Sequence, residues 1–453
     1  MGLPGRASTP NRWRIASAAA IVMLTTGTIY SWGIFTQPLL VAFRWDLTVT
    51  TWTYAIANFS LGAIGVLIGG FWQDRVGPRI VTMVGIALWG SGNVLAGLGT
   101  PALGACWLYL TYGVIGGIGA GMAYITPLSM VTKWFPDKKG LAGGFVAGGF
   151  GMGAFLYNQI VPRLAGFHAA AVHAASFIAA RAAARIAGTP FDSAALLPGQ
   201  TPTAGDIDAV MRVLVGSGII FLIVGLAAAS QLRNPPPDYS PPGYRHGLAL
   251  RRMSSAVVSY SPAQIIATPQ FYLLWLQLFV NVIAGIAIIS NAVFILADLT
   301  GLAAVTIAPL FGLVSIFNAL GRIIWGTLSD RIGCNNTFAA MLGAQAAVLL
   351  LLPDIHNLTL ALAAISVILL CCGGGFGTMP SFNAEYFGTK FMGLNYGLIV
   401  TAWGFAGLVG PILVAKIKDL TGSFTAMLPA FAVLLLAAMI IPFVTAKPAL
   451  QAA

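Results

Sequence analysis

The octapeptide GFWQDRVG at residues 70–77 recurs as GTLSDRIG at residues 326–333, which is 256 positions further along the chain. Each copy follows a long apolar run, and in each copy an Asp-Arg pair stands just before a hydrophobic residue and a glycine. A second echo joins KWFPDKKG at 133–140 to YFGTKFMG at 386–393. Two copies of one pattern indicate a tandem duplication, so the fold is expected to consist of two similar halves.

The composition decides the class of protein. Only 8% of the 453 residues are charged, whereas 58% are hydrophobic. An ordinary soluble domain carries about 25% charged residues. The apolar runs are about 20 residues long and lack the alternation of a membrane β-barrel. The sequence therefore predicts an all-α integral membrane protein that is embedded in a lipid bilayer.

Apolar windows predict twelve transmembrane helices in two six-helix halves, near residues 13–42, 51–72, 80–99, 104–132, 141–164, 210–232, 270–297, 303–328, 336–353, 357–384, 391–417 and 424–446. The segment 165–209 is helical by its alanines but carries charge, so we expect an external insertion. A thirteenth span would turn the second half upside down. The polar stretch 233–268 is expected to be a cytoplasmic linker between an N-terminal half, residues 1–232, and a C-terminal half, residues 269–453.

The basic residues predict the orientation. With the N-terminus in the cytoplasm, 15 of the 23 Lys and Arg residues are cytoplasmic and 7 are external, and Arg322 alone lies inside a span. This distribution follows the positive-inside rule and accounts for the net charge of +11 without nucleic acid as a partner. We expect a monomer in a cell membrane, such as a bacterial inner membrane, with both termini cytoplasmic.

Arg322 lies inside the apolar run SIFNALGRIIWGTLSDR at 315–331. A helical count places Asn318 and Ser315 within about 40° of it on one face. A charge at membrane depth is costly unless it faces a cavity or a partner, which suggests a functional site. The alternative is that the side chain snorkels to the interface. The equivalent position in the first repeat is Val66, so the helix itself does not need the arginine.

The two repeated turns place charge at the ends of helices. Asp74, Arg75, Asp330 and Arg331 are expected to pair with neighbouring helix ends and to latch the halves in one state. The alternative is a solvated turn that only follows the positive-inside rule.

The pattern GxxxDRxG after the second and eighth spans resembles the signature of the major facilitator superfamily, and the likeness covers nearly the whole chain. The stretch WFPDKKGLAGGFVAGGFGMG at 134–153, with YSW at 30–32 and FNALGR at 317–322, is similar to the oxalate/formate antiporter family, bacterial relatives of the monocarboxylate transporters. This resemblance implies a major facilitator fold and a carboxylate transporter. It also implies that Arg322 holds the carboxylate, to which the planar guanidinium is suited.

The family pattern also implies an aromatic cavity. Tyr30 and Tyr124 match aromatic cavity positions of the family. Phe150 and Phe376 stand where oxalate-selective members carry tyrosines, and Trp403 stands where they place a lysine as a second cation. The departures favour a site that carries one positive charge.

Asn281 on the seventh span could donate a hydrogen bond to a substrate or to a neighbouring helix. The spans show no nucleophile–base set, metal cluster or phosphate loop, so no catalytic residue, metal or other cofactor is expected. The sequence predicts a secondary transporter of small monocarboxylates, such as lactate, pyruvate or formate, that works by alternating access with proton coupling or exchange. The alternatives are an oxalate:formate antiporter, a non-transporting carboxylate sensor and an anion channel.

Overall fold

The computed structural model describes residues 11–186, 203–236, 239–241, 259–302, 304–421, 423 and 425–448. Within these residues every regular element is a helix, as the composition predicts. The second part of the expected insertion, 187–202, and the middle of the expected linker, 242–258, lie outside the described residues.

The first group of helices precedes the linker. Its members are α1 (Arg12–Gly27), η1 (Thr28–Ser31), α2 (Gly33–Phe43), α3 (Leu47–Phe59), η2 (Ser60–Gly65), α4 (Val66–Val76), α5 (Pro78–Leu108), η3 (Tyr109–Gly116), α6 (Gly117–Trp134), α7 (Lys139–Ile160), η4 (Val161–Arg163), α8 (Ala165–Ile186), α9 (Ala204–Ile220), η6 (Phe221–Gly225) and α10 (Leu226–Ala229). We call these helices the N-terminal group.

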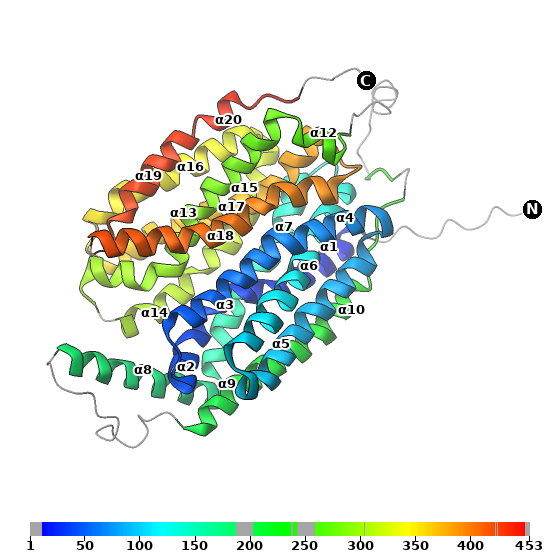
Figure 1. Cartoon of the computed structure of the whole chain (residues 1–453). Coiled ribbons are helices and arrows are strands. Elements are labelled where there is room, and N and C mark those ends of the chain that lie inside the picture. Colours follow the sequence, from blue (N-terminus) through cyan, green and yellow to red (C-terminus); the bar gives the residue numbers. More distant parts are fainter. Residues whose placement is uncertain are drawn as a thin grey trace, which may run out of the picture.

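The second group begins at the end of the linker. Its members are α12 (Pro262–Ile266), α13 (Pro269–Thr300), α14 (Ala304–Val314), α15 (Ile316–Ile332), α16 (Cys334–Leu351), η7 (Leu352–Asp354), α17 (Leu358–Phe387), α18 (Met392–Thr421), α19 (Met427–Ala438) and α20 (Ile441–Val444). We call these helices the C-terminal group, and Figure 1 shows the two groups lying against each other.

Ten helical segments of the described chain are long and apolar enough to cross a membrane, and a pair of helices bent by 46°, Arg12–Ser31 with Gly33–Phe43, makes an eleventh. One of the ten, Pro78–Trp134, has 57 residues. A straight helix of that size would be about 86 Å long, nearly three times the hydrocarbon thickness of about 30 Å.

This long segment is two crossings. The backbone leaves the helical conformation at Gly104, where φ is 71° and ψ is −157°, a region that favours glycine. Beyond this point α6 packs back along α5, so that a side chain at Gly119 would meet the backbone of Trp89 and Gly85. Counting both legs and the bent pair gives, within the described residues, the twelve crossings that the apolar windows predict.

The described part of the expected insertion forms α8. Figure 1 shows α8 running sideways at the end of the bundle opposite to α10 and α12. It packs against α2 and α9, and the ring Nδ1 of His173 lies 2.9 Å from a carboxylate oxygen of Asp206 at the start of α9. Within the described residues, α8 is not among the segments that are long and apolar enough to cross a membrane.

The two groups meet along two seams, in which α7 lies against α15 and α4 lies against α18. Glycines allow this close approach. A side chain at Gly144 of α7 would collide with the carbonyl group of Arg322, and one at Gly70 of α4 would collide with that of Gly393. Direct contact between helix backbones is the usual role of small residues in membranes. The first seam places Arg322 at the boundary between the groups.

Candidate binding site around Arg322

Arg322 lies on α15, and none of its surface is exposed. Its Nε and Nη2 donate to Oδ1 of Asn318, one helical turn earlier, at 3.4 and 3.3 Å. Its Nη1 has no hydrogen-bond partner among the described residues. Complete burial excludes the snorkelling alternative, since a snorkelling side chain keeps its charged head in water.

The third residue of the predicted polar face, Ser315, lies between α14 and α15. Its backbone keeps helical angles, with φ of −57° and ψ of −22°, and Leu310–Ile332 forms one apolar span across it. Its hydroxyl donates to the carbonyl of Gly312 at 2.7 Å, so Asn318 is the residue of this face that contacts Arg322.

Two phenylalanine rings flank the buried charge. The guanidinium Cζ of Arg322 lies 5.1 Å from the ring centroid of Phe150 on α7 and 4.8 Å from that of Phe376 on α17. A cation over an aromatic face at such distances is stabilised by the ring quadrupole. One helix from each group therefore contributes to holding the cation.

Trp403 on α18 is the centre of a ring cluster beside this cation. Its ring centroid lies 4.9 Å from Phe376, 5.1 Å from Tyr124, 5.6 Å from Phe150 and 5.7 Å from Tyr30. Tyr30 and Tyr124 each meet the Phe150 ring edge to face, at 5.2 and 5.3 Å. The structure thus brings together the five predicted aromatic residues.

The duplication explains part of this arrangement. The spacing between the echoed motifs at 133–140 and 386–393 is 253 residues, and the same spacing leads from Phe150 to Trp403. The two rings therefore occupy equivalent places on α7 and α18, the fifth and eleventh crossings. Each group therefore contributes one of these two rings from an equivalent position in the repeat.

Two buried hydrogen-bond donors of the cluster, Nη1 of Arg322 and Nε1 of Trp403, have no partner among the described residues. The hydroxyls of Tyr124 and Tyr396 lie close to each other, and that of Tyr124 also lies close to the Arg322 guanidinium. An unsatisfied buried donor costs about 1–3 kcal/mol, and a charged one costs more. Arg322 also lies within electrostatic range of both tyrosines. An anionic acceptor at this place would satisfy donors from α15 and α18.

Tyr396 is a residue that the sequence reasoning missed. It lies on α18 and none of its surface is exposed. It precedes Trp403 by seven residues, which is two helical turns, so both side chains lie within about 20° of one face. The stretch NYGLIVTAW at 395–403 contained this signal.

Asn281 lies in the contact between α13 and α17. Its Nδ2 donates to the carbonyl of Cys371 at 3.4 Å, which is a hydrogen bond to a neighbouring helix, the alternative to a hydrogen bond with a substrate. Its Oδ1 has no hydrogen-bond partner among the described residues. A role of Asn281 in substrate binding stays a prediction.

Both aspartates of the repeated turns cap a helix of the opposite group. Asp74 accepts the backbone N–H groups of Gly393 and Leu394 at the start of α18, at 3.1 and 3.0 Å. Asp330 accepts two N–H groups at the start of α7, both at 2.8 Å. A carboxylate at a helix N-terminus satisfies free N–H groups and opposes the positive end of the helix dipole. The duplication thus builds two matching contacts between the groups.

The arginines of these turns behave differently. Arg75 places its Cζ 3.9 Å from the ring centroid of Phe71 on its own helix, and both Arg75 and Arg331 are exposed. Neither takes part in an ion pair within the described part of the chain. The gating role of all four residues stays a prediction, and the geometry favours the aspartates for it.

Arg322 is the only lysine or arginine that is buried among the residues whose exposure the structure describes. Within the same residues no group of three or more His, Cys, Asp or Glu side chains could hold a metal ion. The site is therefore one cation inside an aromatic cluster, at the boundary between two helix groups. A duplicated helical bundle with such a site defines the class of secondary membrane transporters.

Residues 15–411 match the family described as the Major Facilitator Superfamily. The match covers most of the chain, so this protein belongs to the Major Facilitator Superfamily, whose members are transporters and not enzymes. The family and the fold class predicted from the sequence are confirmed. The chain is also similar to a solved member, FucP in the outward conformation, with a TM-score of 0.65, 13% sequence identity, and coverage of 96% of this chain and 99% of that one.

Two characterised relatives are named after carboxylates. An oxalate:formate antiporter of Oxalobacter formigenes is 27% identical over 441 residues, which cover 95% of this chain and 92% of the relative. An apicoplast pyruvate carrier of Toxoplasma gondii is 29% identical over 402 residues, which cover 80% of this chain and 69% of the relative.

Proposed function

We propose that this transporter moves small monocarboxylates, such as lactate, pyruvate or formate, and that Arg322 binds the carboxylate. The observation that carries the proposal is the single buried cation of the described residues. One guanidinium neutralises one carboxylate and can hold both of its oxygens. The Phe150 and Phe376 rings then leave an apolar surface for the rest of a small acid, with Tyr124 and Asn318 as neutral hydrogen-bonding groups.

We infer that transport proceeds by alternating access between the two halves, residues 1–232 and 269–453. The caps of Asp74 and Asp330 support this mechanism, because they join the groups at one end and are made of hydrogen bonds that can break and re-form. The linker end is proposed to face the cytoplasm, with both termini, in a bacterial inner membrane. The protein is proposed to act as a monomer that is coupled to protons or exchanges anions.

Oxalate:formate exchange is the second candidate, and the antiporter relative favours it. Against it stands Trp403, which occupies the position where the family pattern for oxalate has a lysine. A dianion would bring its second carboxylate towards this apolar ring cluster, and a buried unpaired charge costs several kcal/mol.

The test is counterflow of labelled lactate into proteoliposomes that are preloaded with unlabelled lactate, pyruvate, formate or oxalate. The proposal predicts accumulation with the three monocarboxylates and little with oxalate. Binding without accumulation would identify a sensor, and ionic current without counterflow would identify a channel. Either of these results would contradict the proposed transport mechanism.

A further inference from the structure

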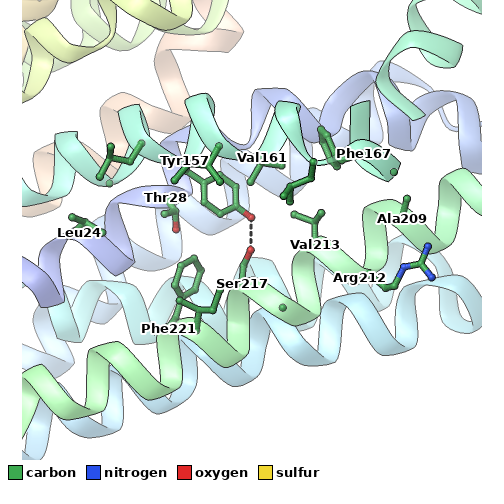
Figure 2. Close-up of a pocket in the computed structure, with 17 residues that line it drawn as sticks. Leu24, Thr28, Tyr157, Val161, Phe167, Ala209, Arg212, Val213, Ser217 and Phe221 are labelled. Carbon is green, nitrogen blue, oxygen red and sulfur yellow. Dashed lines mark hydrogen bonds between the residues drawn. The ribbon is translucent and has the colours of Figure 1, made fainter. Parts of the chain in front are cut away.

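A cavity of about 580 Å³ opens in the side of the N-terminal group, and none of its lining residues belongs to the Arg322 site. Figure 2 shows it between α7 and α9, with Leu24 and Thr28 of α1 and η1 behind it. The hydroxyls of Tyr157 and Ser217 hydrogen-bond to each other at 2.7 Å across it, so the one polar contact between its walls is already satisfied.

The cavity faces lipid. Ile160 and Ile220 line it, and 57% and 58% of their surfaces are exposed. Ile220 lies in the middle of the apolar span Ala204–Ala229, and Ile160 lies three residues before the end of the span Lys139–Arg163, so these exposed side chains face the bilayer. The space therefore opens sideways into the membrane, where hydrocarbon chains are the material available to fill it.

The depth of the cavity matches one leaflet. Lining residues on the α9 and η6 side run from Ala209 to Phe221, which is twelve residues or about 18 Å along a helix, and the part from Arg212 to Phe221 is about 14 Å. Half of the hydrocarbon thickness of about 30 Å is about 15 Å. In Figure 2, Arg212 stands at the end near Ala209, whereas Leu24 and Phe221 lie towards the other end.

Arg212 stands at the headgroup level. It precedes Ala229, the last residue of this span, by 17 residues, which is about 26 Å of helix. The guanidinium is thus near the edge of the hydrocarbon layer, which its long side chain can reach. It is exposed, and it takes part in no ion pair within the described part of the chain.

We propose that this cavity is a binding site for an anionic phospholipid, with one acyl chain between α7 and α9 and the headgroup phosphate on Arg212. The apolar lining, the depth of one leaflet and the unpaired positive charge at the mouth each fit this occupant. A guanidinium binds phosphate oxygens through two parallel N–H groups. An Arg near an anionic lipid surface contributes about 1 kcal/mol, which corresponds to about fivefold in affinity.

Two variants separate the parts of the site. Gly216 lines the cavity, and a Cβ placed there meets no atom within 4 Å, so Gly216→Trp fills the space that the acyl chain occupies. Its control is Ile223→Trp on the same crossing, which is 66% exposed and outside the lining. Arg212→Gln removes the headgroup contact, and its control for net charge is Arg181→Gln, which changes an exposed arginine of α8.

The measurement is native mass spectrometry of the full-length protein titrated with dioleoyl phosphatidylglycerol or dioleoyl phosphatidylcholine. The native protein and both controls should prefer phosphatidylglycerol by about fivefold. Arg212→Gln should lose this preference, and Gly216→Trp should lose the tightly bound molecule of either lipid. Because Arg212 is exposed, its variant tests the site even if Gly216→Trp does not fold.

Three results would overturn the proposal. Binding by folded Gly216→Trp at the native affinity would place the lipid elsewhere. Equal affinities of the native protein for the two lipids would leave only an apolar groove without headgroup recognition. A dimer that forms in the native protein without added lipid, and is absent in Gly216→Trp, would show that a second copy covers the cavity.

Discussion

Replacing Trp403 by lysine should change the preference of the transporter from monoanions towards oxalate. The Trp403 ring lies within 5.7 Å of four aromatic rings, so a second carboxylate placed there has no cation to pair with. An unpaired buried charge costs about 3 kcal/mol or more, and 1.4 kcal/mol corresponds to tenfold in affinity. The native protein should therefore bind oxalate at least about 100-fold more weakly than lactate, and Trp403→Lys should reduce this ratio at least about tenfold.

The assay is competition for labelled lactate counterflow by oxalate, lactate, pyruvate and formate. Trp403→Phe is the matched control, because it keeps the site apolar and should retain the native order of affinities. A methyl group gains about 0.8 kcal/mol on burial, so lactate and pyruvate should compete about fourfold better than formate. A native protein that prefers oxalate, or a lysine variant with an unchanged ratio, would refute the one-cation argument.

Two further predictions concern the carboxylates outside the site. Asp330→Asn should lower the thermal unfolding temperature by several degrees and slow transport, because a charge-assisted cap between the groups is lost. Arg331→Gln removes an exposed charge without an ion pair, so it should change neither the unfolding temperature nor the transport rate. Equal effects of the two variants would refute the proposed latch role of Asp330. Asp298, near the end of α13, and Glu385, near the end of α17, are the acidic residues close to the predicted spans. Acid-stimulated uptake should survive Asp298→Asn with Glu385→Gln, because both residues lie near helix ends and Glu385 is already paired with Lys447 at 2.6 Å. Loss of this stimulation with exchange intact would show a dedicated proton relay.

Much of the fold could be predicted because it repeats itself and because lipid permits few architectures. The apolar windows predicted a turn between residues 99 and 104, and the chain reverses at Gly104 even though helical hydrogen bonding continues across it. Ser315, which the helical count placed on the face of Arg322, donates its hydroxyl to the carbonyl of Gly312. A count of residues predicts the face on which a side chain lies, but it does not predict the hydrogen-bond partner of that side chain.

The candidate site was predictable where the duplication or the family pattern singled out a residue, as for Arg322 and Trp403. Tyr396 was missed although its spacing places it on the same helix face as Trp403. The partners of Asp74 and Asp330 could not be predicted, because they are backbone N–H groups of the opposite group. Contacts of this kind depend on how helices pack and not on residue type.

The cavity between α7 and α9 could not be predicted from the sequence either. It depends on the gap between α7 and α9 and on the position of Phe167 of α8 at one end. Its apolar lining is the ordinary composition of a membrane helix. Only the packing distinguishes these residues from others that face lipid.

The most direct test of the proposed function is lactate binding to purified Arg322→Ala, measured by calorimetry together with thermal unfolding. If Arg322 binds the carboxylate, the variant should stay folded without measurable lactate binding, and its unfolding temperature should be at or above the native one, because a buried charge without an ion-pair partner is removed. Arg322→Lys should bind weakly, because it lacks the planar fork. Native affinity for lactate in Arg322→Ala would contradict the assignment of Arg322 as the carboxylate-binding group.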